Sequence, residues 1–361
     1  MRKWWDNMKP IPIDKLEEGM KLAKTIYNES GQLLLGAGMA LKSNYIERLK
    51  KMNIPEIYIM DDNFPDIKAP EPISDKTRLE AIKVVKNTME SIKLGSEIDL
   101  AKVNQAVDSI LDEILLQNHV VIHLNDIRTY DSYTFQHSVG VTILSILMSL
   151  HFNYTREEVK KIAIGAFLHD VGKTKVDKDI IMKPGKLTEE EYEEVKQHST
   201  YGYHIIREVA GISILSAHIA YQHHEYIDGS GYPRGLKGEE ISNWAQIVTV
   251  ADIYDALTSD RVYKRKLMPH EALKIINELK GIKLSPECVD ALLKHVAVFP
   301  VGAMVELDNN QVGIVVDVNK EDLSRPIVRI IEDEHGNKIQ DIKEIDLIHN
   351  DNFKINRVIY N

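Results

Sequence analysis

The chain has a single cysteine, Cys288, among its 361 residues. Intramolecular disulfides and cysteine-rich metal sites are therefore excluded, and any transition-metal site must use histidine and carboxylate ligands. A basic excess is also lacking, since 45 Lys and Arg residues face 55 Asp and Glu residues for a net charge of -10. This balance argues against a nucleic-acid polymer or an anionic membrane as a partner. It still allows a small anionic substrate held through bound cations.

Long apolar runs are missing as well. The most apolar stretch, residues 139–152, is too short to span a bilayer and contains Ser145, Ser149 and His151. The first ten residues contain no apolar run of signal-peptide length. With 43% hydrophobic and 28% charged residues, the composition is that of an ordinary globular protein. We expect a soluble, cytoplasmic protein with no membrane segment.

The hydrophobic pattern divides the chain into four parts. Residues 1–66 predict a small accessory α/β module, and residues 67–119 predict a proline-containing linker followed by helices. Residues 120–298 predict helices almost throughout, whereas residues 299–361 predict a small β module. The predicted fold is therefore mainly α, with an all-helical domain flanked by an N-terminal mixed module and a C-terminal β module.

Local signals place several elements within these parts. Two capping boxes, Thr155 with Glu158 and Thr188 with Glu191, predict helix starts. A third start is predicted at Ser285-Pro286, because proline is favoured at the first helical position. Other expected elements are strands at 20–27, 32–35 and 56–60, a helix at 43–51, helices between 74 and 117, a glycine-rich loop at 228–242, and strands at 304–307, 312–318 and 326–331.

Histidines are concentrated in the predicted helical part. Fourteen are present, and ten of them fall between positions 119 and 224. A lone histidine on a helix is usually a packed or surface residue, and we expect this of His119, His123, His151, His204, His218, His270, His295, His335 and His349. Two strings differ: His169-Asp170-Val171-Gly172-Lys173, and the stretch from His223-His224-Glu225 through Asp228-Gly229 to Gly231-Tyr232-Pro233.

Such groups are costly to bury among helices unless they are hydrogen-bonded or bound to metal. A helix-terminal ion pair would also explain His169 and Asp170, but it leaves the paired His223 and His224 without a role. A metal cluster that acts on a phosphate explains both strings, and it predicts an enzyme.

The two strings, together with His198 and with Asp252 in Val250-Ala251-Asp252-Ile253-Tyr254-Asp255-Ala256-Leu257, closely resemble the HD-GYP family. This family belongs to the HD superfamily of metal-dependent phosphohydrolases. The resemblance covers about residues 120–298. The double histidine followed at this spacing by a Gly-Tyr-Pro loop is its most specific part. The resemblance implies a cyclic di-GMP phosphodiesterase of bacterial type, which opens the cyclic dinucleotide to linear pGpG, and further to GMP in some members.

The resemblance also implies a metal centre. One metal would be held by His137, His169 and Asp252, the other by His198, His223 and His224, with Asp170 bridging the two. Without the resemblance, His137 is explained equally well as a polar residue on a half-buried helix. Imidazole and carboxylate ligands suit iron or manganese. Some family members bind a third metal through a glutamate where this chain has Tyr133. Since a phenol is protonated at neutral pH, we expect two divalent ions.

The implied mechanism is attack on a phosphodiester by a metal-bridged hydroxide. Asp170 and Lys173 would be catalytic, with Lys173 neutralising charge on the phosphoryl oxygens. Tyr232 would stack on a purine, although it could equally pack the loop or contact a partner. Arg261 and Lys264 match positions that contact substrate phosphates in the family, but surface charge also explains them. Asp255, one turn from Asp252, would orient a ligand imidazole, unless it is a helix-surface carboxylate.

Two other functions stay open on the sequence alone. An HD-type phosphohydrolase acting on another nucleotide or cyclic dinucleotide would use the same ligands. A receptor that binds cyclic di-GMP without cleaving it would signal through the flanking modules, although the complete ligand set argues against it. The resemblance further suggests contact of the Gly-Tyr-Pro loop with GGDEF-domain proteins, and we include a homodimer among the expectations.

Overall fold

The computed structural model describes residues 8–23, 25–27, 33–51, 56–60, 71–117, 120–122, 133–183, 185–259 and 267–359. The described residues fall into two compact units. One lies within residues 1–71, 121–132 and 296–361, and the other within residues 72–120 and 133–295. The first unit contains the N-terminal and C-terminal modules, and the second contains the helices.

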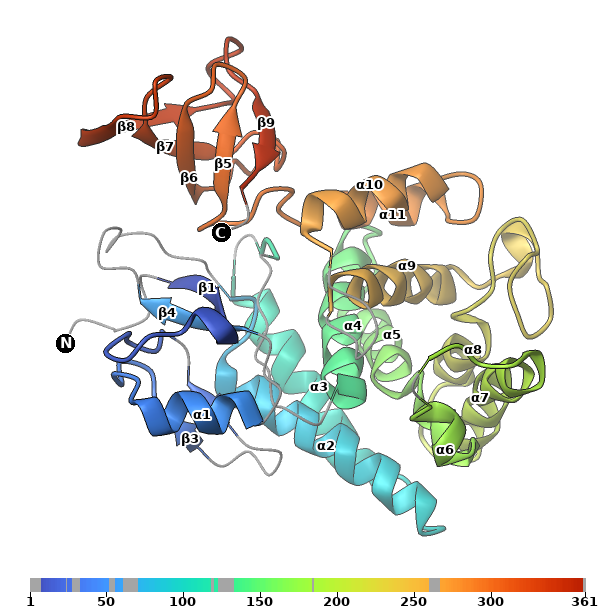
Figure 1. Cartoon of the computed structure of the whole chain (residues 1–361). Helices are drawn as coiled ribbons and strands as arrows, with labels where there is room; N and C mark the ends of the chain where they lie inside the picture. The colour runs from blue at the N-terminus through green and yellow to red at the C-terminus, as the bar shows by residue number, and fades with distance from the viewer. Residues whose placement is uncertain are drawn as a thin grey trace. The chain divides into compact units, whose positions relative to one another are not determined.

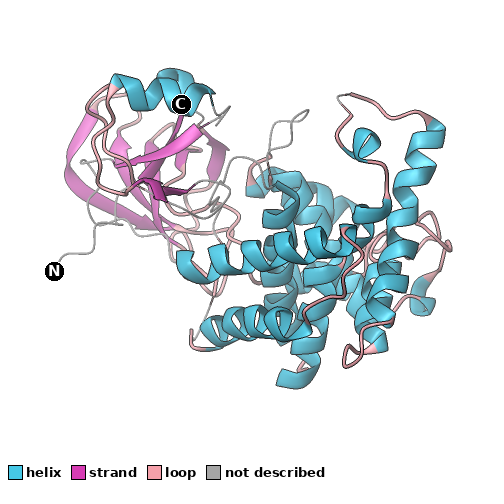
Figure 2. Ribbon diagram, turned by 90° about the horizontal axis from the view of Figure 1, so that it is seen from below, coloured by secondary structure: helices cyan, strands magenta, loops and turns pink. Residues whose placement is uncertain are grey.

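The second unit is helical (Figures 1 and 2). Its helices are α2 (Asp75–Lys93), α3 (Leu100–Leu115), α4 (Tyr133–Leu150), α5 (Arg156–Leu168), α6 (Lys178–Ile181), α7 (Glu189–Arg207), α8 (Ile214–Gln222), α9 (Asn243–Thr258), α10 (Pro269–Leu279) and α11 (Pro286–Leu293), with 3-10 turns η2 (Val171–Lys175) and η3 (Gly238–Glu240). The prediction of a mainly α fold with flanking modules is confirmed.

Helix α4 is the centre of this unit. It packs against α2, α3, α5, α9 and α11, and every side chain from residue 141 to residue 149 is buried. The most apolar stretch of the sequence is therefore a core helix that is covered on all sides. Among the described residues, no helix has the length and apolarity needed to cross a membrane.

The predicted helix starts at Thr155, Thr188 and Ser285 are confirmed. The side-chain oxygens of Thr155 and Thr188 each accept a hydrogen bond from the backbone N–H three residues later, and the carboxylate of the glutamate at that position accepts one from the backbone N–H of the threonine. Ser285 accepts from the backbone N–H of Cys288, with Pro286 at the first helical position. Each cap satisfies N–H groups that the helix itself cannot pair.

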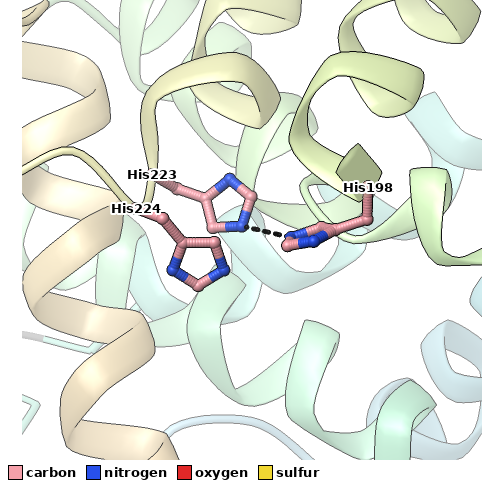
Figure 3. A group of neighbouring side chains, drawn as sticks. All are labelled: His198, His223 and His224. Atoms are coloured by element: carbon pink, nitrogen blue, oxygen red, sulfur yellow. Dashed lines mark hydrogen bonds between the residues drawn. The ribbon is translucent and has the colours of Figure 1, made fainter. Parts of the chain in front are cut away.

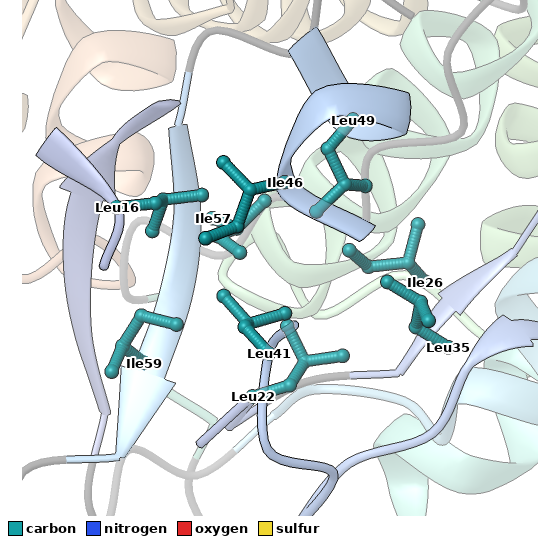
Figure 4. Close-up of a cluster of buried hydrophobic side chains, with 9 residues drawn as sticks. All are labelled: Leu16, Leu22, Ile26, Leu35, Leu41, Ile46, Leu49, Ile57 and Ile59. Carbon is teal, nitrogen blue, oxygen red and sulfur yellow. The ribbon is translucent and has the colours of Figure 1, made fainter. Parts of the chain in front are cut away.

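The N-terminal module contains two small sheets and one helix. Strand β1 (Met8–Pro12) pairs antiparallel with β4 (Glu56–Met60), and β2 (Ile26–Tyr27) pairs with β3 (Leu33–Leu35). Turn η1 (Ile13–Lys15) and helix α1 (Ser43–Lys51) complete it. Its core, drawn in Figure 4, consists of Leu16, Leu22, Ile26, Leu35, Leu41, Ile46, Leu49, Ile57 and Ile59.

Two details of this module differ from the prediction. The expected strand over 20–27 is regular only at Ile26–Tyr27, with single bridges from Lys21 to Ala40 and from Leu22 to Ile59. Strand β1 was not predicted because it carries Pro10 and Pro12. A strand with a single partner tolerates proline, since the missing N–H need not face a neighbour.

The C-terminal module is a five-stranded antiparallel sheet in the order β8-β7-β6-β5-β9. Strands β5 (Met304–Leu307), β6 (Val312–Asp317) and β7 (Ile327–Glu332) were predicted, whereas β8 (Lys338–Asp346) and β9 (Ile355–Val358) were not. The sheet buries Val305, Val315 and Val328 completely. The two unpredicted strands are its edges, where one side of the backbone faces solvent and the apolar alternation is weak.

Candidate metal centre

The His-Asp pair lies at the end of α5, where the helix turns into η2. His169 is the C-cap of α5 and Asp170 precedes η2. Their relative exposures are 0% and 1%. The preceding helix is buried from Ile162 to Leu168, so packing of α5 carries both polar side chains into the interior. Two atoms at this turn, His169 Nε2 and Asp170 Oδ1, are buried without a hydrogen-bond partner.

Gly172 brings η2 into direct contact with α7. A Cβ atom at this position would lie 1.9 Å from the carbonyl oxygen of His198 and 2.5 Å from the backbone nitrogen of Gly202. Only glycine permits this approach. The contact sets His198, which is 1% exposed, beside the His-Asp pair.

Three histidines have their ring orientation fixed in the same way. Because a carbonyl oxygen can only accept, each Nδ1 carries the proton and each Nε2 keeps its lone pair. The Nδ1 atom donates to the backbone carbonyl three residues earlier: His169 to Ala166 at 2.7 Å, His198 to Val195 at 2.6 Å, and His223 to Ala220 at 2.9 Å.

Two of these lone pairs face one another (Figure 3). His198 Nε2 lies 3.3 Å from His223 Nε2, and His224 lies beside them at the end of α8. Burial lowers the pKa of His198 to about 4 and that of His223 well below its usual value. Both rings are therefore neutral at pH 7, with no proton to share between the two nitrogens. A cation between them would satisfy both.

Asp170 lies between two groups of histidines. Its Oδ2 atom is 3.5 Å from His169 Nε2 and 3.9 Å from His137 Nε2. Its Oδ1 atom is 3.6 Å from His198 Nε2 and 4.0 Å from His223 Nε2. Each carboxylate oxygen thus faces a different group, which is the arrangement that a bridging ligand requires.

Asp252 on α9 also reaches both groups. Its Oδ1 atom is 3.0 Å from His137 Nε2, and its Oδ2 atom is 3.7 Å from His224 Nδ1. The other ring nitrogen of His137, Nδ1, donates to Asp255 Oδ2 at 2.7 Å. Asp255 thus has the contact expected of a residue that orients a ligand imidazole.

The charges in the cluster favour cation binding. Burial alone would raise the pKa of Asp170, but Lys173 and the nearby histidines hold it well below its usual value. Burial likewise opposes ionisation of Asp252, and the hydrogen bond from His137 lowers its pKa instead. His224 has its pKa lowered to about 3, mainly by burial. Two carboxylates therefore stay ionised beside the neutral rings of His198, His223 and His224.

His137 behaves differently. Burial lowers its pKa, but the hydrogen bonds with Asp252 and Asp255 outweigh burial and raise it to about 10. In the charged ring, Nε2 carries a proton and cannot bind an ion. A metal ion at this point would replace the proton on Nε2 and keep the same two carboxylates balanced.

The seven predicted ligands thus converge from five elements of the chain. Two groups could each hold a metal ion: His198, His223 and His224 form one, and His137, His169 and Asp170 form the other. Asp252 contacts both groups, as described above. Orphaned buried atoms, facing lone pairs and ionised carboxylates make these residues a good fit to a pair of divalent ions.

Lys173 and the Gly-Tyr-Pro loop border the cluster. Lys173 Nζ donates to Asp170 Oδ2 at 2.5 Å and its side chain is 30% exposed. The Tyr232 ring lies against the His224 ring, with centroids 4.7 Å apart and planes 32° apart. The backbone N–H of Tyr232 also donates to the carbonyl of His224 at 3.1 Å. Tyr232 thus forms part of the wall of the site.

Glu225 ties this loop to the double histidine. It is 2% exposed, and its carboxylate accepts from the backbone N–H groups of Arg234 at 2.7 Å and Leu236 at 3.0 Å. The sequence contained this residue within the motif, but gave no sign of these contacts, because they join positions that only the folded loop brings together.

Two residues of α7 also approach Tyr232 and had no predicted role. The Tyr192 ring centroid is 6.5 Å from that of Tyr232. Lys196 Nζ lies 5.1 Å from the Tyr192 centroid and 5.9 Å from the Tyr232 centroid. Tyr192 and Lys196 are four residues apart on a predicted helix, which was the only available signal that they share a face.

Several predicted positions lie outside the described residues. These are Arg261 and Lys264, together with His119 and His123. The helix that begins at Tyr133 is described, but its Tyr133 side chain is not. Of the other histidines, His204 is exposed, and the His218 ring lies 5.1 Å from that of Tyr203 and 6.4 Å from that of Tyr221, centroid to centroid.

Comparisons with known proteins find similarity to HD domains and to cyclic dinucleotide phosphodiesterases. Residues 125–287 match the family model of the HD domain, and residues 304–361 match that of a KOW domain associated with HD domain. A cyclic di-GMP phosphodiesterase of Pseudomonas aeruginosa is 35% identical over 238 residues, which cover 66% of this chain and 57% of the relative. A cyclic di-GMP phosphodiesterase of Thermotoga maritima is 44% identical over 173 residues, covering 47% of each chain.

A third relative has a different named substrate. A 3'3'-cGAMP-specific phosphodiesterase of Vibrio cholerae is 32% identical over 227 residues, covering 61% of this chain and 49% of the relative. The chain thus spans about half the length of the curated relatives that it matches.

Proposed function

We propose that this chain is a member of the HD-GYP family and a metal-dependent phosphodiesterase that hydrolyses cyclic di-GMP. The observation that carries the proposal is the buried cluster in which Asp170 lies between two groups of histidines. The curated relatives that overlap this region and are named as cyclic di-GMP phosphodiesterases support the choice of substrate.

The donor set favours two divalent ions, with iron or manganese as the preferred metals. His137, His169 and Asp252 would hold one ion, and His198, His223 and His224 the other, with Asp170 shared between them. When bound, such ions supply Lewis-acid chemistry that polarises a phosphoryl oxygen and makes water more acidic. Asp255 would hold His137 in its ligating orientation through the hydrogen bond at Nδ1.

The residues around the cluster would bind and orient the phosphodiester. Lys173 can move its ammonium from Asp170 to a phosphoryl oxygen, because its side chain is partly exposed. There it would stabilise the charge that develops as the water oxygen bonds to phosphorus and the ester bond breaks. The leaving ribose oxygen takes up a proton, and linear pGpG is the first product. Further cleavage to GMP would repeat the same step.

Substrate contacts outside the cluster are part of the proposal. Tyr232 would offer an aromatic face near the phosphate, and Arg261 and Lys264 would bind phosphate oxygens through charge-assisted hydrogen bonds. Contact of the Gly-Tyr-Pro loop with GGDEF-domain proteins and assembly as a homodimer stay predictions.

A second candidate substrate is 3'3'-cGAMP, because a relative specific for it shares 32% identity with this chain. Its phosphodiester would meet the same ligands, so discrimination would depend on contacts to the second base. A third candidate, a receptor that binds cyclic di-GMP without cleaving it, would retain binding and show no product.

The deciding experiment combines metal analysis of anaerobically purified full chain with hydrolysis of cyclic di-GMP and 3'3'-cGAMP. We expect two metal ions per chain and faster turnover of cyclic di-GMP. His169→Ala and Asp170→Ala should lose both metal and turnover, whereas Lys173→Ala should lose turnover and keep the metal. His204→Ala, a change at an exposed histidine of the same helix as His198, is the matched control and should keep both. A metal-loaded chain that leaves cyclic di-GMP intact would refute the proposal.

A further inference from the structure

The first turns of α7 hold an exposed aromatic residue in a fixed place. Tyr192 is 45% exposed, although it directly follows the capping box of Thr188 and Glu191. Lys183 Nζ reinforces this turn by donating to both carboxylate oxygens of Glu191, at 2.6 and 2.7 Å. The Tyr192 ring is therefore held on an ordered turn and stays accessible to a ligand.

Aromatic rings lead from the metal cluster to this position. The His223 and His224 centroids are 4.0 Å apart, and those of His224 and Tyr232 are 4.7 Å apart. Tyr192 follows at 6.5 Å from Tyr232, with the planes at 78°. The planes of the two tyrosine rings are close to perpendicular, so Tyr232 does not stack on Tyr192, and the exposed part of the Tyr192 ring stays open to a flat group.

A cation lies over both tyrosines. Lys196 Nζ is within 6 Å of the Tyr192 and Tyr232 centroids, at 5.1 and 5.9 Å, and it forms an ion pair with Glu193 at the helix surface. Cation–π contacts of this kind hold rings in position. The Lys196 ammonium also places positive charge beside the cluster, where bound metal ions would attract a phosphate.

We propose that Tyr192, Lys196 and Tyr232 form a purine-binding rim, in which Tyr192 stacks on the nucleobase next to the phosphate held at the metal cluster. This inference rests on the proposed function, because it takes the cluster as the phosphate site. The nucleobase of a bound nucleotide lies to one side of its phosphate, and the rim is the aromatic surface that the described residues place beside the cluster. Stacking tolerates several bases because every base has a π-face, and a purine offers the larger face.

The rim can be tested by equilibrium binding, without turnover. The probes are GMP and ribose 5-phosphate, which share a sugar phosphate and differ in the base, added to the full chain loaded with Mn²⁺. We expect wild-type protein to bind GMP more tightly. Tyr192→Ala should weaken GMP binding about 5- to 150-fold, the range for loss of one base stack, and leave ribose 5-phosphate binding unchanged. Tyr192→Phe should bind GMP as wild type does.

Two controls separate the rim from general effects. Tyr203→Ala removes a tyrosine of the same helix that stacks on Tyr221 and not on Tyr232, and it should leave GMP binding unchanged. Bound metal, measured for every variant, should match that of wild type.

The inference is overturned if Tyr192→Ala binds GMP as wild type does, if it loses both probes equally, or if wild type does not distinguish the probes. If the chain distinguishes GMP from ribose 5-phosphate through Tyr192 but does not cleave cyclic di-GMP, the inference about the rim stands and the proposed function is refuted.

Discussion

Replacing Gly172 by alanine tests whether the contact between η2 and α7 builds the metal centre. The added Cβ would lie 1.9 Å from the His198 carbonyl oxygen and 2.5 Å from the Gly202 nitrogen. Both atoms belong to the backbone of a helix, so neither can rotate away. The two segments must separate by more than about 1 Å to restore ordinary van der Waals contact.

The expected cost has two parts. Forcing an extra methyl group into a packed interior destabilises a protein by about 1–3 kcal/mol, and the rigid neighbours here favour the upper end. The separation also moves His198 away from Asp170, whose Oδ1 atom is now 3.6 Å from His198 Nε2. A shift of about 1 Å in catalytic geometry can lower the rate by about 100-fold. Both stability and turnover should therefore fall.

The assay compares Gly172→Ala with Gly202→Ala, a change on the other side of the same contact. A Cβ at Gly202 would lie no closer than 3.4 Å to any neighbour, the nearest being Ala220 Cβ, and alanine favours a helix. We expect lower melting temperature, metal content and cyclic di-GMP turnover for Gly172→Ala alone. Equal behaviour of the two variants in these three measurements would refute the reasoning.

Three further predictions follow from single contacts. Asp255→Ala removes the acceptor of His137 Nδ1 and should weaken metal binding about 10- to 100-fold in a metal titration, with unchanged circular dichroism; wild-type affinity would contradict this. Glu225→Ala leaves two backbone N–H groups without their acceptor, which costs about 1–3 kcal/mol for each group. The free energy of unfolding measured by chemical denaturation should therefore fall. An unchanged denaturation midpoint would contradict this prediction. Cys288 is 3% exposed and burial raises its pKa to about 12. Iodoacetamide should therefore label its thiol only in denaturant. Rapid labelling of the native chain would show that the thiol is accessible and refute the prediction.

The helical part of the fold was predictable because its signals are local. A capping box such as Thr155 with Glu158 joins groups that lie within one helical turn. Neighbouring residues alone are therefore enough to recognise it in a sequence. Strand β8 pairs with the adjacent strand β7 and was missed because its apolar alternation is weak, whereas the pairing of β9 depends on distant residues. Val305, for example, pairs with Val358, more than fifty positions later.

The convergence of the candidate ligands was predictable for a different reason. Nothing local connects His137 with Asp252, which lie on α4 and α9 and approach to 3.0 Å. Their grouping came from the family pattern, since the order of the motifs along the chain stands in for their contact in space. Where the pattern assigns no role, as at Tyr192 and Lys196, the sequence shows an ordinary tyrosine and an ordinary lysine on a helix. Their approach to Tyr232 depends on how the Gly-Tyr-Pro loop folds back.

Glycines lie at close approaches beside the cluster. A Cβ at Gly140 would lie 2.3 Å from the side-chain Oδ1 atom of Asp255, the partner of His137, and one at Gly231 would lie 2.4 Å from the His224 carbonyl oxygen. With the contact at Gly172, each group of ligands has a neighbouring position where a side chain would push an element away. The arrangement of the cluster thus depends on missing methyl groups as much as on the ligands themselves.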